Sequence, residues 1–353
     1  MKRRGLFGIF LGVSVTMIFL SIFFVSECAA KGISLDYELW LPSKIAEFPV
    51  IQKYFKGLED ATGGQVKVMF HTGGSMGKGD QTYQRTLSGV NDIGHFAPGY
   101  TPGVFPMLDV FMMPLRYGTA ELLTRTMIPM LETHYFDKEF ANVKVIGFRA
   151  GDHTALWLAK QKVTRLADLK GLKIRTSGES WNKVAKAFGA IPVAVPTGDL
   201  YMMLQKGSVD GSWLAWGGVQ SFKLGEVCKY ANEAPWMTNI HLIAMNKNSW
   251  NRLPKAGKDY LNANWKTLAL DLAKVVDDSR IEFQKMFRDQ GGEIDTFAPG
   301  EFDKADELFA PMWKEWIAER ERKGLPAKEM LKKLEEVMIG LGIKKPIIGY
   351  TPQ

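Results

Sequence analysis

Apolar and polar residues follow two different periods along this chain. Short apolar runs of strand length alternate with longer segments in which apolar residues recur every three or four positions, as on one face of a helix. The expected strands are residues 35–41, 66–70, 91–96, 143–149, 155–159, 172–175, 190–195 and 240–246. The expected helices are residues 49–62, 80–87, 119–136, 180–188, 198–207, 222–228, 254–290, 301–323 and 327–341. This alternation predicts an α/β fold whose sheets are covered by helices.

The stretch 171–216 has the order strand, helix, strand, helix, and its first strand ends on Arg175. In open α/β sheets the ligand crevice lies outside the carboxyl ends of the strands. A guanidinium there can form two parallel hydrogen bonds to a carboxylate. The alternative role is a salt bridge with a nearby acid. A small polar turn, residues 176–178, follows the strand and favours the ligand role for Arg175.

Aromatic residues are the second signal for a binding site. Trp213 and Trp216 follow the turn at Asp210, while Trp40 and the pair His95–Phe96 lie at the ends of other expected strands. Aromatic side chains are usually core residues because they bury a large area. Because these four aromatic residues and His95 lie at or near the ends of expected strands, a role as ligand contacts is about as plausible as a role in the core.

The first thirty residues are expected to be a cleavable export signal and not part of the fold. Lys2, Arg3 and Arg4 precede a long apolar run, and the segment ends on Cys28-Ala29-Ala30. A retained membrane anchor is the alternative, and lipidation of Cys28 is a further possibility. Cleavage would leave Cys228 as the one cysteine, so no internal disulfide could form. An exported protein without disulfides suggests a bacterial periplasm.

Length and charge narrow the class of protein. A chain of 353 residues exceeds the usual size of one hydrophobic core, so two lobes are expected. The net charge is +7, but basic and acidic residues are mixed along the whole length. Nucleic-acid binding is not expected, because no basic stripe with interleaved aromatic residues is present.

The sequence contains little evidence for a catalytic, metal-binding or cofactor-binding site. Residues 73–77, GGSMG, match the G-x-S-x-G pattern of serine hydrolases around Ser75, after an expected strand and before an expected helix. Glycine-rich loops of this kind also form for geometric reasons alone. No zinc-ligand spacing or phosphate-binding loop is present. We therefore expect no enzyme activity, no cofactor and no metal, and keep a Ser75 hydrolase as an alternative.

Several motifs together resemble the solute-binding proteins of TRAP transporters, the DctP type. The matching segments are 62–64 (TGG), 71–77 (HTGGSMG), 89–93 (GVNDI), 166–175 (LADLKGLKIR), 200–211 (LYMMLQKGSVDG), 245–246 (MN) and 253–254 (LP). The resemblance extends over essentially the whole chain after the expected signal. The resemblance implies a two-lobe periplasmic binding protein with a ligand cleft between the lobes and a long helix spanning both.

The resemblance also implies how the chain divides and what it does. Lobe I would comprise residues 31–153 and 242–284, lobe II residues 154–241 and 285–341, and residues 342–353 a flexible tail. Such proteins close on an organic acid by a hinge motion and deliver it to the membrane permease of the transporter. The arginine that grips the substrate carboxylate in this family falls on Arg175.

Departures from the family pattern narrow the expected ligand. Members that bind sialic acids have an asparagine where this chain has Leu214, and a second arginine where it has Ala155. Trp213, Trp216 and Phe96 favour a hydrophobic or aromatic monocarboxylate, and Lys78 is expected to add a positive contact from lobe I. A periplasmic sensor that hands its closed form to a receptor is the remaining alternative.

Overall fold

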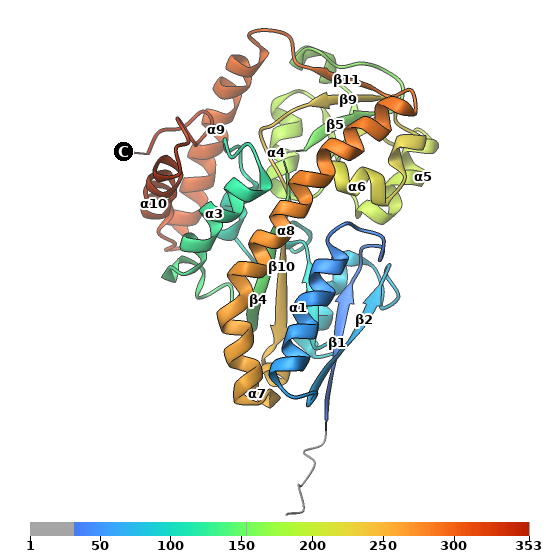
Figure 1. Ribbon diagram of the computed structural model, residues 1–353. Helices are drawn as coiled ribbons and strands as arrows, with labels where there is room; N and C mark the ends of the chain where they lie inside the picture. Colours follow the sequence, from blue (N-terminus) through green and yellow to red (C-terminus); the bar gives the residue numbers. More distant parts are fainter. Residues whose placement is uncertain (1–31, 153, 353) are drawn as a thin grey trace, which may run out of the picture. The chain divides into compact units, whose positions relative to one another are not determined.

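Two β-sheets organise the computed structural model, which describes residues 32–152 and 154–352 (Figure 1). One sheet has the strand order β2-β1-β3-β10-β4 and the other β11-β9-β5-β8-β6-β7. We call each sheet with its helices the first and the second lobe. The strands of the first lobe are β1 (Ile33–Leu39), β2 (Val66–Thr72), β3 (Ile93–Phe96), β4 (Val143–Ala150) and β10 (Ile240–Asn246). Those of the second are β5 (Ala155–Leu158), β6 (Lys173–Thr176), β7 (Ile191–Ala194), β8 (Gly211–Leu214), β9 (Tyr230–Glu233) and β11 (Glu293–Thr296).

Both sheets mix parallel and antiparallel pairs. In the second lobe β6 is parallel to β7 and β8, as the order of elements in residues 171–216 predicts. In contrast, β5 runs antiparallel to β8 and β9, and β10 antiparallel to β3 and β4. The chain passes between the sheets after β4, before β10 and again between β10 and β11. Strands that enter from the other lobe need no helical crossover, so their direction is not forced to be parallel.

One helix links the two lobes. The helices are α1 (Phe48–Ala61), α2 (Thr82–Ser88), α3 (Ala120–Leu131), α4 (Glu179–Ala187), α5 (Leu200–Gln205), α6 (Trp216–Ser221), α7 (Lys247–Arg252), α8 (Lys255–Asp289), α9 (Glu301–Arg322) and α10 (Ala327–Gly340). With 35 residues, α8 is about 52 Å long at 1.5 Å per residue. It contacts α1 and β4 in the first lobe and α6 and β11 in the second (Figure 1). The prediction of a long helix spanning both lobes is confirmed.

Five elements have no counterpart in the predicted set: the strands β8, β9 and β11 and the helices α6 and α7. The strands β8, β9 and β11 each have four residues, and β9 and β11 carry acidic residues because they lie toward one edge of the sheet. Helix α6 begins at Trp216, which the sequence suggests as part of an aromatic loop. Residues 222–228 form a 3-10 turn, Leu224–Glu226, in place of the expected helix. Periods of two or 3.6 residues are hard to detect in such short segments.

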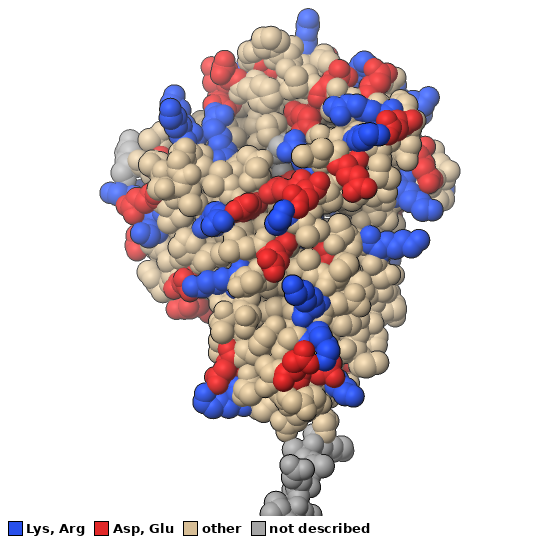
Figure 2. All heavy atoms as spheres, in the orientation of Figure 1, with Lys and Arg blue, Asp and Glu red and all other residues tan. Residues whose placement is uncertain are grey.

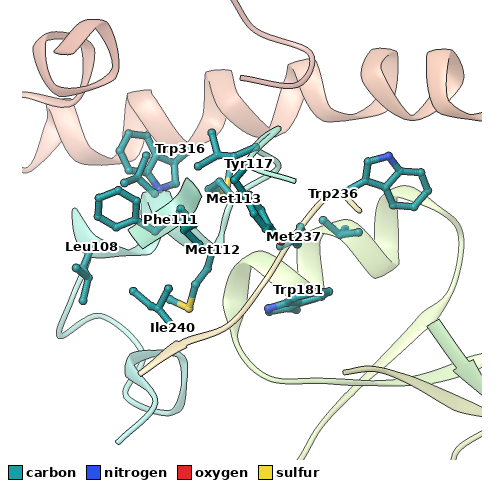
Figure 3. Packing of buried hydrophobic residues seen from close by; sticks show 14 of the residues in the cluster. Leu108, Phe111, Met112, Met113, Tyr117, Trp181, Trp236, Met237, Ile240 and Trp316 are labelled. Atoms are coloured by element: carbon teal, nitrogen blue, oxygen red, sulfur yellow. The ribbon is translucent and has the colours of Figure 1, made fainter. Parts of the chain in front are cut away.

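The largest hydrophobic cluster joins segments that are distant in the sequence. Figure 3 shows Phe111 and Met112, from the proline-flanked stretch after β3, beside Trp316 of α9 and Ile240 of β10. The last residues differ from the flexible tail expected above. Ile347 and Ile348 are buried in this cluster, and the backbone carbonyl of Ile348 accepts a hydrogen bond from the indole of Trp313 at 2.9 Å.

The surface carries charges of both signs. Figure 2 shows lysine and arginine side chains interspersed with acidic ones over the displayed face, with no stripe of one sign. Among the helices in residues 32–152 and 154–352, none is both long and apolar enough to cross a membrane. The expected export signal and its Cys28 lie outside the described residues.

Candidate functional site

Arg175 is a fully buried cation without an acidic partner among the described residues. It lies one residue before the end of β6 and is 0% exposed. Its Nε donates to the carbonyl of Val195 at 2.8 Å, and its Nη2 donates to the hydroxyls of Tyr100 at 2.9 Å and Thr197 at 3.0 Å. Within the described part of the chain, Nη1 has no hydrogen-bond partner. A buried charge compensated only by neutral groups is costly, so the geometry favours an anion beside Arg175.

Arg175 lines a cavity of about 50 Å³ to which both lobes contribute. From the first lobe come the residues after β1, the 3-10 turn at Tyr100, the end of β4 and the start of β10. From the second come β6, the end of β8 and helix α6. The lining residues are Trp40, Leu41, Ile45, Glu47, Ala97, Tyr100, Arg149, Arg175, Ser177, Thr197, Leu214, Ala215, Gly217, Gly218, Ser221, Phe222, Asn239 and His241.

The apolar part of this wall is built around Trp40. Its ring stacks on Phe222 at a centroid distance of 6.1 Å and an interplanar angle of 22°, and it lies 5.8 Å from the ring of Tyr100. Leu214, at the end of β8, lines the same cavity. Trp40 and Leu214 are thus two predicted residues that the fold brings together with Arg175.

A second arginine of the cavity wall is neutralised by its neighbour. Arg149, the penultimate residue of β4, is ion-paired with Glu47 at 2.9 Å, and both residues are buried. The family resemblance places a second arginine at Ala155, which is buried in β5 and does not line the cavity. The sequence signal at Arg175, an arginine near the end of an apolar strand, is also present at Arg149.

A chain of hydrogen bonds supports the wall at His241. Its Nδ1 lies 3.1 Å from Nε2 of His95, and Nδ1 of His95 lies 3.0 Å from the hydroxyl of Tyr37. Burial, followed by the positive charge of Arg149, lowers the pKa of His95 to about 3. The same burial, with His95 and Arg149 nearby, lowers the pKa of His241 well below its ordinary value. His95 therefore lies behind the cavity wall, and His241, not singled out from the sequence, forms the wall.

Three predicted aromatic residues lie in hydrophobic clusters and do not line the cavity. Trp213 packs against Trp181 at 5.9 Å. Trp216 makes an edge contact with Trp157 at 4.6 Å, and Phe96 packs against rings of the first lobe. Successive side chains of a strand point to opposite faces, so Leu214 reaches the cavity while the preceding Trp213 faces the core.

Lys78 joins the lobes at the surface and is not a cavity residue. Its Nζ lies 3.1 Å from a carboxylate oxygen of Asp199, and both side chains are largely exposed. Nearby, the backbones of the two lobes approach so closely that a Cβ on Gly99 would lie 2.6 Å from the carbonyl oxygen of Ser177. Together with the bonds of Tyr100 to Arg175 and Thr197, these contacts hold the lobes against each other.

Among the described residues, the surroundings of Ser75 do not favour a serine hydrolase. Ser75 is exposed in the loop after β2, and no histidine in the described ranges is hydrogen-bonded to its hydroxyl. Within the same residues, no group of three or more His, Cys, Asp or Glu side chains is arranged to hold a metal ion.

Comparison with known proteins gives one consistent family. The model of the bacterial extracellular solute-binding proteins, family 7 (DctP), matches residues 42–320. A monocarboxylate 2-oxoacid-binding periplasmic protein of Nostoc sp. is 27% identical over 221 residues, which are 61% of this chain and 60% of that protein. The chain spans 54% and 60% of the length of two curated relatives that it matches.

Solved structures agree with the fold described above. A TRAP periplasmic solute-binding protein of Desulfovibrio salexigens is similar with a TM-score of 0.74 and 28% identity, over 87% of this chain and 96% of the other. A TRAP solute-binding protein of Rhodoferax ferrireducens with copurified benzoate has a TM-score of 0.82 at 22% identity, over 88% and 98% of the two chains. On the evidence of the family match and these structures, the chain belongs to the TRAP-type bacterial extracellular solute-binding proteins of family 7.

Proposed function

We propose that this protein captures an organic monocarboxylate with a hydrophobic or aromatic body in the periplasm and delivers it to the permease of a TRAP transporter. The observation that carries the proposal is Arg175, buried in the cavity wall with Nη1 unpaired among the described residues and with no acid among its partners. A ligand carboxylate would supply the missing charge and accept hydrogen bonds from the two free N–H groups of Nη1.

The charges of the cavity wall support one carboxylate and not two. Arg149 and Glu47 offset each other, and a buried, neutral His241 adds no charge. Arg175 therefore remains as the uncompensated cation of the wall. A second carboxylate would enter this low-dielectric site without a partner, which is strongly unfavourable.

The apolar wall supports an aromatic or hydrophobic body. Trp40, Phe222 and Leu214 offer ring faces and an aliphatic surface to the ligand. The neighbour with copurified benzoate and the relative that binds monocarboxylate 2-oxoacids are consistent with ligands of this class. Trp213, Trp216 and Phe96 would act through the packing of the two lobes and not by ligand contact.

Hinge closure is the mechanism that the arrangement supports. Arg175 belongs to the second lobe and Tyr100 and Trp40 to the first, so a bound acid would bridge both and stabilise the closed state. Export through a cleaved signal would place the protein in the periplasm. A sensor that passes the closed form to a receptor would use the same site, and binding of the purified permease separates the two roles.

The proposal is tested by thermal unfolding of the purified protein with a panel of mono- and dicarboxylates. A ligand at a hundred times its Kd should add about 2.7 kcal/mol to the free energy of unfolding. Arg175→Ala should weaken binding by about 10² to 10⁴-fold, since two charge-assisted hydrogen bonds are lost. Arg125→Ala, on the exposed surface of α3, is the matched control.

Two results would contradict this function. One is the absence of any thermal shift with the whole panel, including benzoate and 2-oxoacids. The other is a shift that survives unchanged in Arg175→Ala. Mass spectrometry of small molecules released from the freshly purified protein identifies the ligand directly.

A further inference from the structure

Three residues that carry hydrogen-bond donors, Trp40, Asn239 and His241, line the cavity on the side of the first lobe. His241 has no hydrogen bond at Nε2 among the residues described, and it lines the cavity. Asn239 lines it as well, and its side-chain oxygen already accepts bonds from Ser177 at 2.8 Å and Trp181 at 3.1 Å. That pairing turns the amide so that its NH₂ group is the end left to donate.

Trp40 adds a third donor to the same wall. It is 8% exposed, and its indole N–H has no partner within residues 32–152 and 154–352. An indole nitrogen can only donate, and a buried N–H without an acceptor is unfavourable. Its ring centroid lies 5.9 Å from that of His241, so the two rings are neighbours.

The direction of the bonds behind His241 follows from satisfying every buried group. Tyr37 is fully buried, and within the described chain its hydroxyl meets one hydrogen-bond partner, His95. If the hydroxyl donates to Nδ1 of His95, then Nε2 of His95 carries a hydrogen and donates to Nδ1 of His241. His241 then carries its hydrogen on Nε2. In the opposite direction, the hydroxyl hydrogen of Tyr37 would have no acceptor.

We propose that His241 is a specificity-determining residue. Its Nε2–H donates to a second, neutral oxygen of the ligand, which is a hydroxyl or carbonyl group of the same organic acid whose carboxylate Arg175 binds. This inference rests on the proposed function and narrows its substrate class. Trp40 and Asn239 supply further donors on the same wall. The ligand is therefore anchored from the second lobe by its carboxylate and recognised from the first lobe by its second oxygen.

The burial of the histidine pair is consistent with a neutral donor. The low pKa values of His95 and His241 keep both imidazoles uncharged at neutral pH. A neutral N–H favours a hydroxyl or carbonyl oxygen, whereas a second carboxylate would need a cation in its place.

The test compares matched ligand pairs by isothermal titration calorimetry. The pairs are 3-hydroxybenzoate with benzoate, and phenylpyruvate with 3-phenylpropionate, which differ by one neutral oxygen. The unmodified protein should bind the oxygenated member of at least one pair about tenfold more tightly, the ratio expected for one hydrogen bond in a dry site. His241→Phe should reduce the affinity ratio between the two members of that pair to about one, whatever its effect on the Kd of each acid.

Further variants separate a specific role from general loss of packing. His241→Gln keeps an N–H donor and should retain part of the preference in affinity for the oxygenated acid over the unsubstituted one. Tyr37→Phe removes the hydroxyl that fixes the direction of the chain and should reduce the ratio. Tyr54→Phe removes a hydroxyl from the same core that bonds instead to the carbonyl of Ile146, and it should leave the ratio unchanged. Thermal unfolding confirms that each variant is folded.

The tautomer of His241 gives an independent readout. Nitrogen NMR of the imidazoles in the full-length protein should show the hydrogen on Nε2 of His241. A hydrogen on Nδ1, or equal affinity for both members of every pair in the unmodified protein, would overturn the inference. If no carboxylate binds at all, the proposed function itself fails, so the two failures are distinguishable.

Discussion

At the residue scale, the protein keeps polar side chains in dry surroundings and fixes each one with neighbours. Val195 and Thr197, which lie in the same lobe as Arg175, accept two of its hydrogen bonds, so the second lobe by itself orients the guanidinium. Such preorganisation reduces the entropy lost on binding. Two further buried groups, Glu139 and Cys228, show how burial alone changes the chemistry of a side chain.

Burial raises the pKa of Glu139 to about 7, although its carboxylate accepts bonds from the backbone N–H groups of Met107 and Leu108. Between pH 4.5 and 7 the unfolded chain has lost this proton while the folded protein keeps it. Stability should therefore fall as the pH rises across this window, by on the order of 2 kcal/mol.

Urea unfolding at several pH values measures that slope, and Glu139→Gln should reduce it. Asp109, whose pKa is also raised by burial, adds to the slope in both proteins. An identical pH dependence in the variant and the unmodified protein would show that Glu139 titrates normally.

The thiol of Cys228 should be unreactive in the folded protein. It is 1% exposed, and burial raises its pKa to about 12, so almost no thiolate exists at pH 8. We expect labelling by Ellman's reagent to be slower by at least 10²-fold in buffer than in 6 M guanidinium. Rapid labelling in buffer would mean that the region around β9 opens locally.

At the scale of elements, single side chains connect segments distant in the sequence. Asn246 ends β10 and begins α7: its Oδ1 accepts from the backbone N–H groups of Asn248 at 2.8 Å and Ser249 at 3.2 Å. Its Nδ2 donates to the carbonyls of Thr86 at 3.0 Å and Leu87 at 3.2 Å, at the end of α2. One amide thus fixes the helices α2 and α7 to the end of β10.

Asn246→Ala should destabilise the protein by about 3 kcal/mol, because a helix cap and two buried bonds are lost together. Thr119→Ala removes the exposed cap of α3 and should cost about 1 kcal/mol. Urea unfolding followed by tryptophan fluorescence gives both values. Equal effects of the two substitutions would mean that the bonds to α2 contribute nothing.

At the scale of the whole molecule, the contacts between the lobes decide how binding and closure are coupled. Tyr100 of the first lobe accepts from Arg175 and from the backbone N–H of Thr197, so it joins the lobes beside Arg175, the proposed carboxylate contact. Lys78 and Asp199 join them at the exposed rim, where an ion pair contributes little.

Tyr100→Phe should weaken carboxylate binding by about three- to tenfold, because a partly buried hydrogen bond to Arg175 is lost. Small-angle X-ray scattering with increasing benzoate should show closure at correspondingly higher concentrations. Lys78→Ala, the matched variant at the rim, should change the Kd by less than about twofold, and less still in 0.5 M salt. A larger effect at Lys78 than at Tyr100 would place the closing contact at the rim.

The α/β alternation and the helix that links the lobes could be predicted from the amino-acid sequence, which also indicates Arg175 as a candidate ligand contact. These signals are local: a hydrophobic period, an uninterrupted amphipathic run, and a cation closing an apolar strand. The family resemblance rests on the same local segments. Short edge strands such as β11 were missed because four residues carry too little of a period.

Which other side chains reach the cavity follows from the packing of the two sheets and could not be read from the sequence. Leu214 and Trp213 are adjacent, yet one lines the cavity and the other is buried in the core, because a strand alternates its side chains between two faces. Which face meets the cleft depends on how the sheets pair and how the lobes meet. His241 and Tyr100 join Arg175 for the same reason: the contact that unites them is made by folding, across many residues of chain.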